Sequence, residues 1–375
     1  MRRVFCIILL LVILPVNYFA AAAADEPVEI PDVRFVINGN PIVLSDVPIG
    51  LNSRTMLPLR AVLVSLGVPN DDEHLLWNGE DKSVTVNYNG SSIYLKIDSK
   101  TAYIDGNAVE LDAAPFGYAK NDRVYIPVRF IAKAVGKEAA WDGYTKTVYL
   151  RDAGAYGEIA AILEKAETAM EAAAKAKIDT EMVVSIINEG EEMGFDVKMK
   201  EEQDRVAGIL HTEMTIPVLE NLVTFSNYYK DNTEYSKGPA SIEWKKTEMK
   251  EKDFKKLFDN EMSLMSINNM DVLSATLGTL ETANPDEILI AGNVYPRGII
   301  ENLAVYSGIN GLEADEYYVE VAVDKATGLL KSVFIEMGGR FKTANGYSKI
   351  NAEIEAVYSE INGDFELILP DMGER

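Results

Sequence analysis

The sequence predicts an α+β protein: a small α/β module occurs twice, and a curved antiparallel sheet with helices on its inner face follows it. Two observations support this fold class. One set of landmarks appears twice between residues 33 and 151, and most of the chain from 154 to 370 alternates between apolar and polar side chains in short segments. A repeat of this length is typical of a duplicated supersecondary unit, and alternation of period two is typical of strands with one buried face.

The first 24 residues have the pattern of a secretory signal peptide. Arg2 and Arg3 supply positive charge, the run from Cys6 to Phe19 is apolar, and Ala20 to Ala24 are small residues of the kind that precede a cleavage site. The alternative is a membrane anchor, but the apolar run is short for a span. We therefore expect cleavage after Ala24 and a secreted, cell-envelope location. Cleavage also removes the one cysteine, so the mature chain is expected to form no disulfide and to hold no cysteine-bound metal.

The mature chain is strongly acidic. Without Arg2 and Arg3 it carries 34 basic residues against 59 acidic ones, a net charge of −25. Nucleic-acid binding depends on clustered Lys and Arg, so this balance argues against a nucleic-acid partner. It suits a protein that stays soluble outside the cell.

The duplicated unit keeps its landmarks in the same order in both copies. They are Asn38-Gly39-Asn40 and Asp105-Gly106-Asn107, Pro58 and Pro127, Arg60 and Arg129, Gly67 and Gly136, and Trp77 and Trp141. Equivalent landmarks lie 64 to 69 residues apart. Each copy is predicted to contain a hairpin around the Asn/Asp-Gly turn, a short helix that begins near the proline and ends before the glycine, and further strands.

Two residue types in the repeat allow both a functional and a structural interpretation. Arg60 and Arg129 could bind anions, but an arginine at a helix start in both copies more often ties a loop in place. Trp77 and Trp141 could stack on a ligand, but each is followed by a turn, which favours a large ring that caps a small core.

These landmarks resemble the copper amine oxidase N-terminal-like domain of bacterial envelope proteins, over about residues 33–151. The resemblance implies a small mixed α/β stalk and does not imply an oxidase. That class of enzyme needs three histidine ligands for copper, whereas this chain has only His74 and His211. It also needs a tyrosine in Asn-Tyr-Asp/Glu as the source of its quinone, whereas Asn87-Tyr88 is followed here by Asn89. The ligand count excludes copper amine oxidation.

The carboxy-terminal half begins with a predicted amphipathic helix at 156–177, in which apolar residues recur at helical spacing. Alternating strands follow at 195–199, 210–216, 225–229, 233–235, 317–323, 329–337 and 352–358, and a final strand is predicted at 365–369. Between 251 and 280 the pattern is helical again. So many alternating segments predict an antiparallel sheet, which at this length would curl around helices on its inner face.

This order of elements is similar to that of the LolA-like lipoprotein-carrier superfamily, over about residues 154–370. The segments that carry the resemblance are Tyr228 to Tyr235, Trp244-Lys245-Lys246, and Tyr318 to Val321 leading through Asp324-Lys325-Ala326-Thr327-Gly328 to Val333-Phe334-Ile335. The resemblance implies a half-barrel whose concave face, partly plugged by helices, holds acyl chains or other lipophilic groups.

The candidate lining of that concave face consists of aromatic and methionine side chains: Phe225, Tyr228, Tyr235, Trp244, Phe254, Phe258, Met262 and Met265. Methionine-rich surfaces repack readily around apolar ligands. Hydrophobic spacing alone does not separate a ligand cavity from a filled core, so the alternative is that the same residues fill the core.

No catalytic motif stands out in the sequence. There is no phosphate-binding loop, GxSxG, HExxH or metal-spaced histidine pair, so we expect no enzyme activity, no cofactor and no metal. The expected division is a signal peptide at 1–24, a stalk domain at 25–151 and a half-barrel domain at 152–375. The predicted function is a secreted bacterial cell-envelope protein that binds a hydrophobic or amphiphilic, lipid-like ligand in the half-barrel. The first alternative is a purely structural spacer or adhesion protein that contacts a cell-wall component, and an uncharacterised hydrolase is the second.

Overall fold

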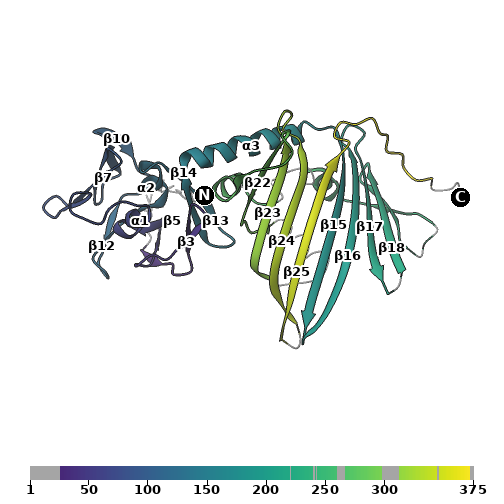
Figure 1. The fold of residues 1–375 in the computed structure, drawn as a ribbon, viewed down its shortest axis with the longest axis horizontal. Coiled ribbons are helices and arrows are strands. Elements are labelled where there is room, and N and C mark those ends of the chain that lie inside the picture. Colours follow the sequence, from purple (N-terminus) through teal and green to yellow (C-terminus); the bar gives the residue numbers. More distant parts are fainter. Residues whose placement is uncertain are drawn as a thin grey trace, which may run out of the picture.

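The computed structural model describes residues 26–219, 221–239, 241, 243–259, 267–297, 312–343 and 346–371. The signal peptide predicted at 1–24 lies outside these residues. The described part is mostly β, with 25 strands and five helices, so helices contribute less than an α+β assignment implies. Figure 1 shows the duplicated module beside a large curved sheet, with helix α3 running from one to the other.

Three small sheets build the duplicated module. The first contains, in order, β1 (Val28–Glu29), β4 (Ile49–Leu51), β5 (Arg54–Pro58), β12 (Arg123–Pro127) and β11 (Phe116–Tyr118). The second contains β10 (Asn107–Glu110), β9 (Thr101–Ile104), β8 (Ser91–Lys96), β7 (Ser83–Tyr88) and β6 (Leu75–Asn78). The third contains β13 (Lys137–Asp142), β14 (Thr147–Asp152), β2 (Arg34–Ile37) and β3 (Asn40–Ile42). The short helices are α1 (Leu59–Ser65) and α2 (Val128–Ala134).

The two copies interlock instead of forming separate units. Equivalent strands β5 and β12 pair antiparallel, with Leu57 opposite Ile126, its equivalent in the other copy. Strand β14, at the end of the second copy, pairs in parallel with β2, at the start of the first. One hydrophobic core draws on both copies as a result, and it includes Leu63 and Ile131, which are both 0 % exposed.

The predicted hairpin turns are confirmed by their backbone angles. Asn38 and Gly39 have φ values of 49° and 80°, and Asp105 and Gly106 have 51° and 80°. Two successive positive φ values define the type I′ turn, which matches the twist of a hairpin and favours Asn-Gly and Asp-Gly.

The second part of the chain forms a single antiparallel sheet of 11 strands. Their order is β20 (Lys245–Glu248), β19 (Thr233–Lys237), β18 (Asn221–Lys230), β17 (Ile209–Val218), β16 (Glu191–Asp204), β15 (Lys175–Asn188), β25 (Gly346–Ser359), β24 (Leu330–Thr343), β23 (Glu313–Asp324), β22 (Glu287–Gly292) and β21 (Gly278–Leu280). Figure 1 shows this sheet curving, so the predicted long, curved antiparallel sheet is present.

Helices α3 (Ala153–Glu171) and α5 (Met270–Thr276) pack against one face of this sheet, which we call the inner face. Leu163 and Leu273 are both 0 % exposed and share one core with Val321 of β23 and Ile335 of β24. The helix predicted at 156–177 therefore exists but ends earlier, at Glu171. The prediction ran too far because Ala and Lys favour helices, whereas here residues from Lys175 onward join the sheet. The remaining described helix is α4 (Glu251–Asp259).

The strand predicted at 365–369 is wrong. These residues belong to an extended tail without strand pairing, and Lys177 Nζ lies 4.7 Å from the centre of the Phe365 ring. The preceding strand β25 already has β24 on one side and β15 on the other, so a following segment finds no free edge beside it.

Candidate functional site

The strand register places one continuous row of side chains on the inner face. Cross-strand pairs run from Val321 through Val333, Ala356, Thr180, Met199 and Met214 to Phe225. Directly paired residues project from the same face of a sheet, so these side chains share one face. Burial changes along the row: Val321 is 0 % exposed and Val333 6 %, whereas Met199 is 38 % exposed and Met214 37 %.

The part of the inner face that spans β15 to β18 is more exposed than the part that packs against α3 and α5, and we call it the open half. Except for Thr180, its side chains are apolar, and they are partly or largely exposed: Met182, Phe195, Val197, Met199, Met214, Ile216, Val223 and Phe225. A contiguous exposed apolar surface is typical of an interaction or ligand site. Methionine side chains are flexible and polarisable, so this surface can adapt to an irregular apolar molecule.

A polar row borders the open half on the same face. It runs from Tyr358 through Ile178, Glu201, Thr212 and Asn227 to Ser236. Burial, with a smaller contribution from the charge of Glu201, raises the pKa of Tyr358. The inner face is therefore amphiphilic, with apolar rows beside a row that can form hydrogen bonds.

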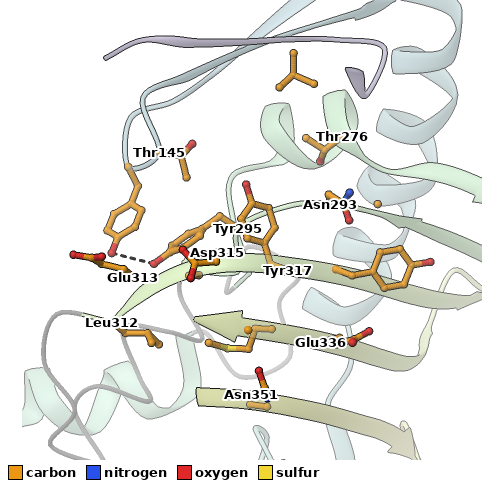
Figure 2. Close-up of a pocket in the computed structure, with 18 of the residues that line it drawn as sticks. Thr145, Thr276, Asn293, Tyr295, Leu312, Glu313, Asp315, Tyr317, Glu336 and Asn351 are labelled. Carbon is orange, nitrogen blue, oxygen red and sulfur yellow. Dashed lines mark hydrogen bonds between the residues drawn. The ribbon is translucent and has the colours of Figure 1, made fainter. Parts of the chain in front are cut away.

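A cavity of about 1150 Å³ lies where the duplicated module meets the sheet, and we call it the junction cavity. Arg34, Lys146 and Tyr149 line it from the module, and Tyr317 and Glu313 line it from β23. Figure 2 shows the tyrosines, acidic side chains and asparagines gathered around this space. Its volume is of the order found for sites that bury small molecules.

Three tyrosines join the module to the sheet at this cavity. The rings of Tyr144 and Tyr295 stack with centroids 4.7 Å apart, and the Tyr295 hydroxyl donates to the Tyr144 hydroxyl at 3.1 Å. The ring of Tyr317 meets that of Tyr295 edge-on at 5.6 Å. Burial raises the pKa of Tyr149, Tyr295 and Tyr317 above the usual value for tyrosine.

The junction cavity and the open half are connected along the inner face. Cross-strand pairs run from Tyr317 through Met337, Ala352 and Val184 to Phe195. Met337 and Ala352 line the cavity, and Phe195 belongs to the open half. An apolar strip of the sheet therefore links the open half to the tyrosine-lined cavity, and its central residues Met337, Ala352 and Val184 are 2 %, 3 % and 5 % exposed.

The structure does not bring the eight predicted lining residues together on one face. Phe225 lies on the inner face. Tyr228 is three positions further along the same strand, so its side chain projects from the opposite face, and Tyr235 pairs with it there. Trp244 contacts Tyr228 there, with ring centres 5.5 Å apart. The rings of Phe254 and Phe258 on α4 lie 5.2 Å apart. Met262 and Met265 lie outside the described residues, and none of the other six lines the junction cavity.

The open half includes two methionines, Met199 and Met214, that the sequence analysis assigned to strands but did not nominate as lining. The signal that could have identified them is the alternation along each strand, because both methionines stand at positions whose side chains project from the inner face. Register was needed to align them with Phe225, and it is set by strand pairing and not by local pattern.

The two histidines lie far apart in the fold, as expected from their separation in sequence. His74 Nδ1 lies 2.8 Å from Asp71 Oδ1 in the duplicated module, whereas His211 on β17 is 8 % exposed and contacts Glu202 and Ser226. In the described ranges, no group of three or more His, Cys, Asp or Glu side chains is arranged to hold a metal ion. The search of the same ranges finds no helix with the length and apolarity to cross a membrane.

The structural interpretation of Arg60 is confirmed. Its guanidinium donates to Asn70 Oδ1 at 2.8 Å and to the Leu75 carbonyl at 3.5 Å, which ties down the loop before β6. Arg129 is exposed. The tryptophans are less enclosed than a core cap implies, because Trp77 is 49 % exposed and Trp141 42 %.

A comparison with known protein families finds a match within the duplicated module. Residues 36–150 match the family described as the copper amine oxidase N-terminal domain. The duplicated module is a copper amine oxidase N-terminal domain. We therefore call it the stalk domain, because the resemblance to this family implies a stalk. No curated protein matches the chain in sequence.

Solved structures resemble the part that contains the large sheet. The lipoprotein LppX of Mycobacterium tuberculosis is 10 % identical, with 56 % of this chain and 98 % of that chain covered and a TM-score of 0.31. A LolA superfamily protein of Nitrosomonas europaea is 9 % identical, with 53 % and 90 % covered and a TM-score of 0.18. A DUF1329 family protein of Desulfovibrio piger is 12 % identical, with 57 % and 94 % covered and a TM-score of 0.20. The site described above rests on register and burial, and not on these similarities.

Proposed function

We propose that this chain is a secreted, non-enzymatic protein of the bacterial cell envelope that binds a hydrophobic or amphiphilic molecule on the inner face of its large sheet. The observation that carries the proposal is the row from Val321 to Phe225, which is buried under helices at one end and exposed through Met199 and Met214 at the other. Burying about 100 Å² of such apolar surface against a ligand contributes roughly 2.5 kcal/mol. A lipid-like chain would supply that contact.

The ligand is proposed to be amphiphilic because polar groups lie at both borders of the apolar surface. The row that contains Glu201 and Thr212 lies along one side, and the junction cavity lies at the end of the apolar strip that contains Met337 and Ala352. The acyl chain would lie on the open half, with its polar end at one of these borders. In this arrangement no polar group of the ligand is buried without a hydrogen-bonding partner.

Native mass spectrometry of protein purified from its own host tests the proposal, together with binding of the fluorescent fatty acid cis-parinaric acid to delipidated protein. We expect a co-purified mass that organic extraction removes, and saturable probe binding afterward. Protein that carries no extractable molecule and does not bind the probe would support the alternative, in which both domains are structural spacers in the cell wall.

A further inference from the structure

The stalk domain has a hollow of its own, of about 730 Å³, which we call the stalk hollow. Both copies of the repeat contribute to it: Leu59, Arg60, Trp77 and Lys82 come from the first copy, and Phe116 and Arg123 from the second. None of these residues takes part in the proposed lipid site. Its volume falls in the range of small-molecule sites, roughly 300–1,000 Å³.

Trp77 is held at the rim of the stalk hollow with about half of its surface free. It pairs with Val84, which pairs with Leu95, and those neighbours are 8 % and 2 % exposed, whereas Trp77 is 49 % exposed. A Cβ at Gly79 would lie 3.4 Å from the indole Nε1, so the turn after the strand packs closely along the ring. One part of the indole thus belongs to the core, and the remainder offers a rigid apolar surface.

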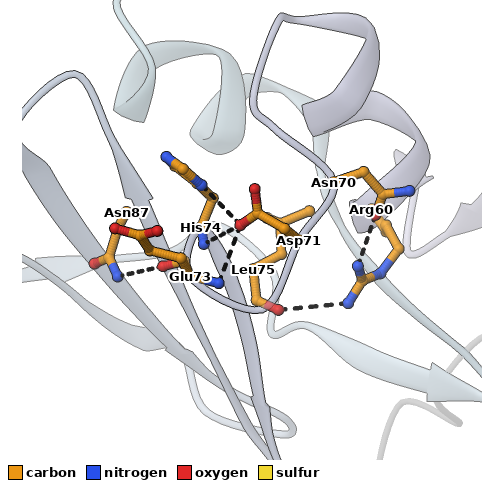
Figure 3. A network of polar contacts seen from close by, with 7 residues as sticks. All are labelled: Arg60, Asn70, Asp71, Glu73, His74, Leu75 and Asn87. Atoms are coloured by element: carbon orange, nitrogen blue, oxygen red, sulfur yellow. Dashed lines mark hydrogen bonds and ion pairs between the residues drawn. The ribbon is translucent and has the colours of Figure 1, made fainter.

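Two arginine side chains line the same hollow as Trp77 and have polar contacts of their own. Figure 3 shows Arg60 held by Asn70 and by the carbonyl oxygen of Leu75, at 2.8 and 3.5 Å. Arg123 lies at the start of β12, with its Nε 3.7 Å from Asp46 Oδ2. These contacts position the guanidinium groups without removing them from the hollow's lining.

The charges around the stalk hollow balance, although the chain as a whole has a net charge of −23. Three cationic residues, Arg60, Lys82 and Arg123, face three acidic ones, Asp46, Asp98 and Asp122. A strongly anionic ligand would meet the carboxylates, and an acyl chain would offer no hydrogen-bonding group to the charged side chains of the lining. A neutral ligand with many hydroxyls meets both kinds of group, because each hydroxyl donates and accepts hydrogen bonds.

We propose that the stalk hollow binds an oligosaccharide, with the apolar face of one sugar ring against Trp77 and its hydroxyls bonded to the arginine and aspartate side chains. The stalk domain then attaches the protein to glycan, while the sheet binds its own ligand. This inference does not depend on the proposed lipid site.

Isothermal titration of the full mature chain tests the inference, with three soluble probes: chitotetraose, cellotetraose and peptidoglycan fragments. We expect at least one to bind with a Kd of about 1 mM or tighter. The Trp77→Ala variant should weaken that binding at least about tenfold, equivalent to about 1.4 kcal/mol. Arg123→Gln, at an exposed side chain, should weaken it about threefold or more without affecting folding.

Trp141→Ala is the matched control, because Trp141 is the equivalent residue of the other copy, is 42 % exposed and does not line the stalk hollow. It should leave the affinity within about twofold. Absence of binding to all three probes would overturn the inference, and so would equal losses in the two tryptophan variants or unchanged affinity in Trp77→Ala and Arg123→Gln. Binding of cis-parinaric acid should be the same in all of these variants, which separates this outcome from failure of the lipid site.

Discussion

The Arg151 guanidinium donates a hydrogen bond to the carbonyl oxygen of Ser274 at 3.3 Å, although the two residues are 123 positions apart. Arg151 belongs to the last strand of the stalk domain, and Ser274 belongs to α5, which packs on the inner face of the large sheet. The same guanidinium also bonds to the carbonyl oxygen of Leu277. Carbonyl groups at the end of a helix lack partners within the helix, so one arginine both caps α5 and joins the two domains.

Replacement of Arg151 by alanine should therefore destabilise the junction. Two carbonyl groups in a partly buried setting lose a charged donor, which is expected to cost about 1–3 kcal/mol. Urea unfolding of the full chain measures the loss, and the transition should also broaden or split as the domains uncouple. Arg340→Ala is a matched control, because its ion pair with Glu313 is about half exposed on both sides, and it should cost less than about 1 kcal/mol. Equal losses in the two variants would contradict this role for Arg151.

Charge placed on the open half should abolish binding of an apolar ligand. The double variant Met199→Glu/Met214→Glu puts two carboxylates where the acyl chain is proposed to lie, and it should weaken binding of cis-parinaric acid more than about tenfold. Both side chains are more than a third exposed, so the fold should tolerate the change. Val357→Glu is the control, because Val357 is 42 % exposed, projects from the opposite face of β25 and does not line the junction cavity. If Val357→Glu weakens binding as much as the double variant, the ligand does not lie on the inner face.

Local pattern was sufficient to predict most elements of this fold but not how they meet. The hairpin at Asn38-Gly39, the helix that contains Leu163 and the strands on either side of Asp231 were all legible, because turn chemistry and hydrophobic period are local properties. The interlocking of the two copies through β5 and β12 was not, since it depends on which strand edges remain free.

The prediction that Tyr228 and Tyr235 share a face with Phe225 was wrong for a related reason. Phe225 and Tyr228 are three positions apart in one strand, so alternation alone places them on opposite faces. The prediction grouped them because both are aromatic, although their spacing in the strand separates them. The register that aligns Phe225 with Met214 and Met199 required the pairing of three strands, and no single segment carries that information.

The two histidines should differ in their contribution to stability. His211 is 8 % exposed, stacks on Tyr228 at 4.0 Å, and its ring nitrogens lie 3.0 Å from Glu202 and 3.1 Å from Ser226. His211→Ala should cost about 1–3 kcal/mol, because it leaves polar groups without partners and creates a void. His74→Ala removes only an exposed contact with Asp71 and should cost less than about 1 kcal/mol. Urea unfolding near neutral pH measures both, and a larger loss in His74→Ala would contradict the prediction.

The stability that the contact between His211 and Glu202 contributes should decrease at low pH. Burial opposes ionisation of Glu202, but hydrogen bonds from His211 and Lys177 outweigh it and hold its pKa below the usual value. A carboxyl with a lowered folded-state pKa stabilises the fold above its unfolded pKa, and that stability is lost as pH falls through the folded value. The difference in unfolding free energy between the parent chain and Glu202→Gln should therefore shrink below about pH 4. A difference that stays constant down to about pH 3 would exclude this linkage.

The stalk–sheet junction should weaken at alkaline pH, since burial raises the pKa of Tyr149, with smaller contributions from Tyr317 and Asp142. A tyrosine whose folded-state pKa is raised stabilises the fold fully below its unfolded pKa near 10, and this stability is lost as pH rises through the folded value. Unfolding free energies measured in urea should thus fall as pH rises above about pH 10, and should fall less in Tyr149→Phe because phenylalanine does not titrate. Tyr347→Phe is the control, because Tyr347 is 57 % exposed, and its pH dependence should match the parent chain. If Tyr149→Phe and Tyr347→Phe lose stability in parallel with the parent over this range, ionisation of Tyr149 does not govern the alkaline transition.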